Sequence, residues 1–154
     1  MDRHGYELPL QLAAAFRRII DELHHRLAAE GHPNLRPAYG FALQAVGNDG
    51  CTVSDLGRRL GVSKQAATKT ATKLADLNYV TRTPSPTDAR AVLLTLTPHG
   101  HNALTRSAQI FETLHAEWKT ALGPTRLAAL EDALPKLTPS SRPTPLSDLP
   151  GWFH

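Results

Sequence analysis

The chain has 154 residues, of which 41% are hydrophobic and 20% charged, so it is apolar enough to fold around a core and too apolar for a disordered chain. Its single cysteine, Cys51, excludes an intrachain disulfide framework and any metal site built from several thiolates. No apolar run approaches the roughly 20 residues that a membrane-spanning helix needs, and residues 1–7 lack the apolar stretch of a signal peptide, which predicts a cytoplasmic protein.

The net charge of +3 is distributed unevenly along the chain. Residues 51–100 contain seven Lys or Arg and three acidic residues, whereas the rest of the chain contains ten basic and eleven acidic residues. The whole basic excess therefore lies in the middle third. This distribution predicts an anionic partner that binds to that part of the molecule.

The N-terminal part of the chain has the apolar spacing of helices. Spacings of three and four predict an amphipathic helix over residues 8–29, with an apolar stripe of Leu12, Phe16, Ile19, Ile20, Leu23 and Leu27. Gly31 and Pro33 follow and predict its end. A second, shorter helix is predicted to start at Pro37 and to stop before the glycine-containing segment 47–50.

Two further helices are predicted around Gly61. Thr52 is a suitable N-cap for a helix over Val53–Leu60, and Ser63 for one over Lys64–Leu77, after which Asn78 tolerates the left-handed conformation. Two short helices joined by a turn with a glycine match the helix-turn-helix pattern of DNA-binding proteins.

After Asn78 the apolar period changes from that of a helix to that of a strand. Residues 79–83 and 91–96 are predicted to form two strands of a hairpin, and residues 84–90 an exposed loop. A long helix is expected over residues 98–121. A last helix carries Leu127, Leu130 and Leu134, and we expect Pro135 to limit its length.

These elements predict a mainly α fold with a small β-hairpin wing, that is, a winged helix-turn-helix flanked by long helices. The expected organisation is an N-terminal dimerisation helix (1–36), a DNA-binding region (37–100), C-terminal dimerisation helices (101–137) and a proline-rich tail (138–154). The long helices offer more apolar surface than so small a winged domain covers, which favours a homodimer over an intramolecular bundle.

The second helix of the predicted helix-turn-helix has two different faces. Ala67, Ala71, Leu74 and Leu77 share one side and should pack inward. The opposite side carries cationic and short polar side chains that suit phosphates and base edges in the major groove: Lys64, Gln65, Thr68, Lys69, Thr72 and Lys73. We expect these residues and Ser63, the N-cap, to form the DNA-binding site, with Lys64 and Lys73 chiefly on phosphate.

The loop of the predicted wing carries one cation close to an acid. Arg90 is suited to enter the minor groove beside a helix docked in the major groove. Asp88, two residues earlier, is expected to orient the Arg90 guanidinium by a bidentate pair of hydrogen bonds. An ordinary surface ion pair is the alternative for these two residues.

Two runs of sequence carry a resemblance to a known family. They are LGVSKQA (60–66) followed by Leu74, Leu77, Tyr79, Val80 and Arg82, and Asp88-Ala89-Arg90 followed by LTPHG (96–100). Over residues 52–100 the chain resembles the MarR family of transcriptional regulators. The resemblance implies a homodimeric winged helix-turn-helix that binds a pseudo-palindromic operator. Such proteins usually repress, and many of them release DNA when a small, often aromatic, effector binds. Asn78 and Thr70 depart from the family pattern, which more often has a glycine and an apolar residue there.

An effector between the dimerisation helices and the winged domain would change the separation of the two recognition helices. Candidate residues for such a pocket are Phe16, His25, Tyr39, Phe41 and Trp118, for which ordinary core or interface packing is the alternative. The chain has no phosphate loop, nucleophile elbow or metalloprotease helix, so we expect neither catalysis nor a cofactor.

Three alternatives remain open at this stage. A zinc-responsive regulator would use Glu112 and His115 with His24 and His25, although the spacing is not that of a zinc motif and His32 falls in a segment expected to be mobile. A winged helix that binds protein rather than DNA would carry a neutral or acidic recognition face. Cys51 is either a redox switch or, as we expect, a small apolar filler, and Trp152 and Phe153 are candidates to dock the tail.

Overall fold

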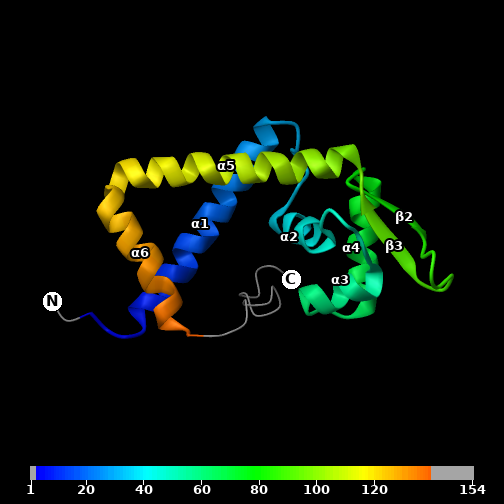
Figure 1. Ribbon diagram of the computed structural model, residues 1–154, viewed down its shortest axis with the longest axis horizontal. Coiled ribbons are helices and arrows are strands. Elements are labelled where there is room, and N and C mark those ends of the chain that lie inside the picture. Colours follow the sequence, from blue (N-terminus) through cyan, green and yellow to red (C-terminus); the bar gives the residue numbers. More distant parts are fainter. Residues whose placement is uncertain (1–2, 140–154) are drawn as a thin grey trace.

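The computed structural model describes residues 3–139, in which long helices lie at one end and a winged helix-turn-helix at the other (Figure 1). The predicted tail, including Trp152 and Phe153, lies almost entirely outside the described residues. α5 (Pro98–Leu122) runs from the winged domain to the opposite end of the molecule, α1 (Glu7–Ala29) crosses it, and α6 (Pro124–Leu137) turns back from its far end. None of the helices in this described part has the length and apolar composition needed to cross a membrane.

The helix-turn-helix has the predicted boundaries because the predicted caps form. The Thr52 hydroxyl accepts a hydrogen bond from the Asp55 N–H (3.1 Å), and the Asp55 carboxylate accepts one from the Thr52 N–H, so a capping box starts α3 (Val53–Leu60). Gly61 ends α3 in the left-handed conformation with φ 68°. The Ser63 hydroxyl accepts from the Ala66 N–H (3.1 Å) and starts α4 (Lys64–Asp76).

The sheet has one strand more than the sequence predicts. β2 (Val80–Pro84) and β3 (Val92–Leu96) form the expected antiparallel hairpin, and β1 (Cys51–Thr52) pairs with the other edge of β3 to give the order β1-β3-β2. A two-residue strand has no detectable period and was therefore not predictable. Gly50 leads into it with φ 76°, and a Cβ there would lie 2.5 Å from the Leu94 carbonyl oxygen.

The main core fills the space between the helix-turn-helix, the sheet and the helices that cover them. Its largest fully buried aliphatic side chains come from five different elements and are Leu27, Leu43, Leu56, Leu74 and Leu94. α2 (Pro37–Val46) starts at the predicted proline and connects this core to α1 and α5. The recognition helix, α4, is thereby fixed against the rest of the fold from its buried side.

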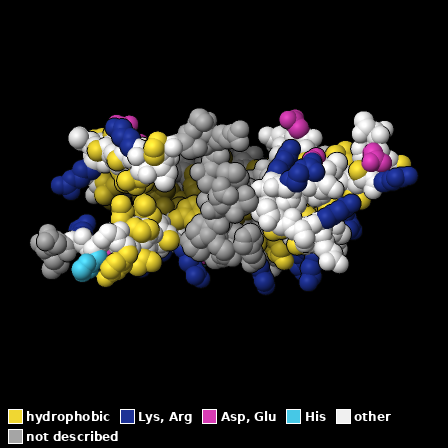
Figure 2. All heavy atoms as spheres, turned by 90° about the horizontal axis from the view of Figure 1, so that it is seen from below, with side chains coloured by type: hydrophobic (Ala, Val, Ile, Leu, Met, Phe, Trp, Pro, Cys, Tyr) yellow, Lys and Arg dark blue, Asp and Glu magenta, His cyan; other side chains and the backbone are white. Residues whose placement is uncertain are grey.

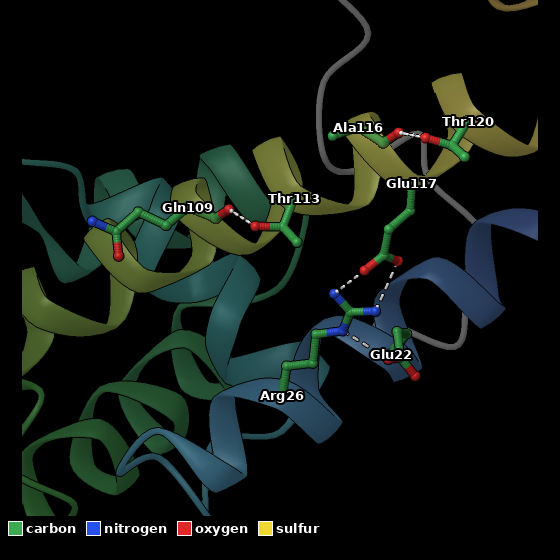
Figure 3. Close-up of polar contacts among 7 residues, drawn as sticks. All are labelled: Glu22, Arg26, Gln109, Thr113, Ala116, Glu117 and Thr120. Carbon is green, nitrogen blue, oxygen red and sulfur yellow. Dashed lines mark hydrogen bonds and ion pairs between the residues drawn. The ribbon is translucent and has the colours of Figure 1, made fainter. Parts of the chain in front are cut away.

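α1 and α5 are joined by an ion pair as well as by packing. The Arg26 guanidinium donates two hydrogen bonds to the Glu117 carboxylate (3.0 and 2.9 Å) and one to Glu22 (2.8 Å), as Figure 3 shows. The hydrogen bonds from Arg26 lower the pKa of Glu117. Because the Glu117 side chain is half exposed and Arg26 is only partly buried, this pair mainly sets where the two helices cross rather than adding much stability.

A cluster of rings connects the start of α5 to the winged domain. His32 is buried, and its Nδ1 lies 2.9 Å from the Tyr79 hydroxyl while its Nε2 lies 2.8 Å from Oδ1 of Asn102. His99 stacks on the Tyr79 ring with centroids 4.5 Å apart. The expectation that His32 lies in a mobile segment is wrong, because the ring is buried and both of its nitrogens have hydrogen-bond partners.

The start of α5 is held against the end of the helix-turn-helix by hydrogen bonds of Thr97. The Thr97 hydroxyl donates to the Asn78 carbonyl (2.6 Å) and accepts from the Gly100 N–H (3.0 Å), while the Thr97 N–H donates to the Tyr79 carbonyl (3.0 Å). Asn78 has the predicted left-handed conformation, with φ 63°. The chain therefore enters α5 at a fixed angle.

The last helix is longer than the sequence predicts. We expected Pro135 to limit it, but α6 continues through Pro135 to Leu137. A proline in the last turn removes one helical hydrogen bond, and the two residues that follow it complete the turn.

Candidate nucleic-acid interface

The exposed face of α4 carries the side chains that the sequence assigned to DNA. Lys64, Lys69 and Lys73 are exposed, as are Gln65 and Thr68. Thr72 is half-buried, and Ser63 lies at the exposed start of the helix, where it forms the N-cap. The face is free of acidic residues as far as Asp76, the last residue of the helix.

The opposite side of α4 is fully buried. Ala67, Ala71 and Leu74 are each 0% exposed. The helical period thus separates core-facing from solvent-facing residues as predicted, so one continuous polar and cationic surface remains for a partner.

The wing, residues 80–96, has an exposed loop in which Asp88 and Arg90 lie as neighbours. The Asp88 carboxylate accepts a hydrogen bond from the backbone N–H of Arg90 (2.9 Å), and the Asp88 carbonyl accepts from the Ala91 N–H (3.0 Å). The expected bidentate pair with the guanidinium is therefore not the contact that the structure shows. A spacing of two residues instead favours a turn in which the acid bonds the backbone. Asp88 fixes the loop, and the Arg90 side chain is exposed.

A groove separates α4 from the wing. Three cations line it, Lys64 from the helix and Arg82 and Arg90 from the wing, together with Val53, Ser54, Thr68, Ala71, Ala91 and Val92. Figure 2 shows Lys and Arg side chains projecting from this end of the molecule. Arg82 was not among the predicted site residues. Its place on an alternating polar and apolar strand that directly follows the cationic helix could have indicated it. Its Nη1 donates to the Thr72 hydroxyl (2.9 Å).

Two cations of the basic middle third have structural roles instead. Arg58 pairs with the Asp55 carboxylate on α3, and Arg59 donates to the Ala45 carbonyl at the end of α2 (2.6 Å). The positive charge left for a partner is therefore concentrated on α4 and the wing.

A hollow lies on the other side of the winged domain, between α1, α2 and α5. Of the five residues proposed for an effector pocket, only Phe41 lines it, and the other lining residues are Ile20, Leu23, His24, Leu35, Gly40, Leu43, Gln44, Ala103, Leu104, Ser107 and Phe111. Phe16 packs near Phe41, with ring centroids 6.4 Å apart.

The other three proposed pocket residues lie elsewhere. His25 is exposed, Tyr39 lies on the α4 side of α2 near Lys73, and Trp118 packs against the core from α5. A one-residue difference in the phase of α1 places His24, rather than His25, on the side that faces the hollow.

The residues considered for metal and redox chemistry are separate in space. Within residues 3–139, no three His, Cys, Asp or Glu side chains come together as a metal site. His115 instead lies 2.7 Å from Glu131 of α6. Cys51 is buried in the core, and burial raises the pKa of its thiol, which leaves little of the nucleophilic thiolate at neutral pH.

The end of the molecule away from the wing exposes many large apolar side chains. We call this surface the apolar end; it comprises Tyr6, Leu8, Leu10, Leu12, Leu122, Leu130, Leu134 and Leu137. Figure 2 shows it as hydrophobic surface opposite the cationic end. Clusters of exposed apolar side chains such as this one are typical of surfaces that contact a partner.

Comparison with known families agrees with this arrangement. The model of the MarR family matches residues 34–91, which include α2, the helix-turn-helix and the wing as far as the loop. This part of the chain is similar to the MarR family of transcriptional regulators, and the chain shares the winged-helix fold of the solved structures that it matches. A search of curated proteins finds no match.

Solved structures extend the similarity to the long helices. The transcriptional regulator Tm0710 from Thermotoga maritima is 25% identical with a TM-score of 0.64, and the match covers 86% of this chain and 92% of that one. The reduced form of MarR from E. coli is 24% identical with a TM-score of 0.73, covering 90% of this chain and 100% of that one. FabT from Streptococcus pneumoniae, solved in complex with DNA, is 17% identical with a TM-score of 0.74, covering 87% and 94%. The last two show likeness of fold.

Proposed function

We propose that this chain is a transcriptional regulator of the MarR type, a homodimer that binds a pseudo-palindromic operator in double-stranded DNA, acts as a repressor in the cytoplasm, and is released by a small effector. Each subunit contributes α4 to the major groove and Arg90 to the adjacent minor groove. The observation that carries the proposal is the continuous cationic surface of α4 and the wing, which is free of acidic side chains along the first three turns of α4.

The apolar end supports the homodimer. Its leucines come from the beginning of α1, the end of α5 and α6, and within one subunit they remain exposed, as Leu130 (45%) and Leu137 (51%) illustrate. A second copy that packs against the same surface removes these side chains from water by a two-fold contact. In such a dimer the two copies of α4 are related by the two-fold axis, as the two half-sites of a palindromic site are.

The hollow between α1, α2 and α5 supports an effector site. Nδ1 of His24 lies 2.9 Å from the Ile20 carbonyl, which only accepts, so Nδ1 carries the proton and Nε2 is an acceptor. Nε2 is buried and has no hydrogen-bond partner within the described residues. Burial lowers the pKa of His24, which keeps the ring neutral at neutral pH. The hollow has a volume of about 30 Å³, so an uncharged aromatic molecule whose hydroxyl donates to Nε2 would have to widen it on binding.

His24→Phe is expected to abolish the response to such an effector, since phenylalanine keeps the ring and loses the acceptor. Phenol, as the probe, should weaken the complex of wild-type protein and operator and leave the variant complex unchanged. Fluorescence anisotropy of labelled operator measures both. His25→Phe, on the exposed side of α1, is the matched control and should respond like wild type. Equal responses of all three proteins would contradict the role of His24.

Selection of random duplex DNA by the purified protein tests the proposed function. We expect enrichment of an inverted repeat whose half-sites are centred about one DNA turn, roughly 10 base pairs, apart. Enrichment of a single half-site would overturn the dimeric arrangement. No enrichment at low salt, where phosphate contacts are strongest, would overturn DNA binding itself.

Arg90→Ala is expected to weaken operator binding by about 1–3 kcal/mol, because it removes charge-assisted hydrogen bonds in the minor groove. Operator titration at constant salt measures the change, and sedimentation checks that the dimer is retained. Arg17→Ala removes an exposed cation of α1 and serves as the control, with wild-type affinity expected. Wild-type affinity of the Arg90 variant would refute the wing assignment.

Lys69→Ala is expected to reduce the salt dependence of operator binding. A lysine that neutralises one phosphate contributes about 0.9 to the slope of log affinity against log salt concentration, so the slope should flatten by about one unit for each half-site. Titrations at four salt concentrations give the slope. An unchanged slope with reduced affinity would indicate a base contact rather than a phosphate contact.

A further inference from the structure

The recognition helix and the wing are joined by one side chain. Arg82 is exposed on β2, opposite Leu94 in the register, and its Nη1 lies 2.9 Å from the Thr72 hydroxyl oxygen on α4. Within residues 3–139 this is the one hydrogen bond between side chains of α4 and the sheet. It therefore couples the position of a residue on the DNA-facing surface to the wing.

The hydroxyl of Thr72 has no proton left for a base. A guanidinium only donates, so the Thr72 oxygen accepts from Arg82. The hydroxyl proton is directed to the Thr68 carbonyl, 3.0 Å away. A hydroxyl has one proton and two lone pairs, so Thr72 retains one lone pair and its methyl group for contacts with DNA.

Other threonines show what Arg82 adds. Thr113 and Thr120 of α5 also donate to the carbonyl four residues earlier, as Figure 3 shows, and Thr68 does so on α4 (2.9 Å). An exposed threonine held by that bond alone turns about its side-chain torsion at small cost and then offers its proton elsewhere. Thr72 is held from two sides and does not.

The consequence for base recognition follows from the edges that the major groove presents. Guanine offers only acceptors there, N7 and O6, to which Thr72 cannot donate. An A·T pair offers the thymine methyl, which packs against a threonine methyl, and the adenine N6 amino group, which donates to a lone pair. A G·C pair offers an amino donor on cytosine but no methyl.

We propose that Arg82 is a positioning residue that locks Thr72 as a reader of an A·T base pair in each half-site. The inference rests on the proposed function, since it requires α4 in the major groove. Arg82 acts on specificity through Thr72, in contrast to Arg90, which belongs to the minor-groove contact.

Comparing enriched operators of four proteins tests the proposal: wild type, Thr72→Ser, Arg82→Met and Arg82→Lys. Serine keeps the bond to Arg82 and loses the methyl, methionine keeps the length of the arginine stem and loses the donors, and lysine retains a donor. Wild type should prefer A·T over G·C by about tenfold at one position of each half-site. At that same position, Thr72→Ser and Arg82→Met should reduce the preference below about twofold, and Arg82→Lys should retain most of it.

The outcomes separate this proposal from the proposed function. Arg90→Ala is the control: it lowers affinity and leaves the base preference unchanged. If Arg82→Met binds more weakly and keeps every base preference, or if it and Thr72→Ser alter different positions, the positioning role is overturned while DNA binding stands. If wild type enriches no inverted repeat, the proposed function itself fails. Thermal melting of each variant confirms that the changes concern folded protein, as expected for substitutions at an exposed and a half-buried position.

Discussion

Replacing Gly100 by alanine is expected to destabilise the protein by about 3 kcal/mol or more. A Cβ on Gly100 would overlap the Tyr79 carbonyl oxygen and would lie 3.2 Å from the carbonyl carbon and 3.3 Å from Cδ2 of Leu96. The opposing atoms are mainly backbone, so they cannot move aside by changing rotamer. The same carbonyl accepts the Thr97 N–H, and a shift of α5 would break that bond too.

Urea denaturation followed by circular dichroism measures this effect. Gly5→Ala is the matched control, since a Cβ there has nothing within 4 Å and the residue does not need a positive φ. The control should unfold at the wild-type urea concentration. If both variants unfold at that concentration, the close approach of α5 to the end of the helix-turn-helix is not a constraint on the fold.

The second large effect is expected from charge placed in the apolar end. In the double variant Leu130→Asp and Leu134→Asp, two carboxylates would have to be buried in the proposed dimer interface, so the protein should become monomeric. Operator affinity should then fall by at least about 100-fold, because a monomer contacts one half-site and loses the gain from linking two. Analytical ultracentrifugation gives the mass, and operator titration gives the affinity.

Val92→Asp is the control for the mass measurement. Val92 is an exposed apolar residue (40%) that belongs to the wing rather than to the apolar end. It should leave the dimer intact. A dimer of unchanged mass in the double variant would place the interface elsewhere on the molecule.

The boundaries of most helices and of the hairpin follow from local signals in the sequence. Thr52, Ser63 and Gly61 begin and end helices by hydrogen bonds and backbone conformations that involve residues only a few positions away. The apolar period then identifies which side of each helix is buried. Such information is complete within a window of about a dozen residues, which is why it could be predicted.

Contacts between distant residues were harder to predict. His32 meets Tyr79 and Asn102 across 47 and 70 positions of sequence, so its burial has no local signal. The bond from Arg82 to Thr72 depends on the angle between wing and helix. His24 and His25 differ by one position on a helix, and only the packing of α1 on α2 and α5 determines which of them faces the hollow. The family resemblance supplied the general arrangement of these elements and not these individual contacts.

The single uninterrupted helix α5 has a mechanical consequence. Its 25 residues connect the ring cluster at the winged domain to the apolar end without a break, a length of about 37 Å. For a rigid rod of that length, a rotation of about 5° at one end displaces the other by on the order of 3 Å. That distance is close to the rise of one base pair. In the proposed dimer, a small tilt between the two subunits would therefore change the separation of the two α4 helices by about one base-pair step.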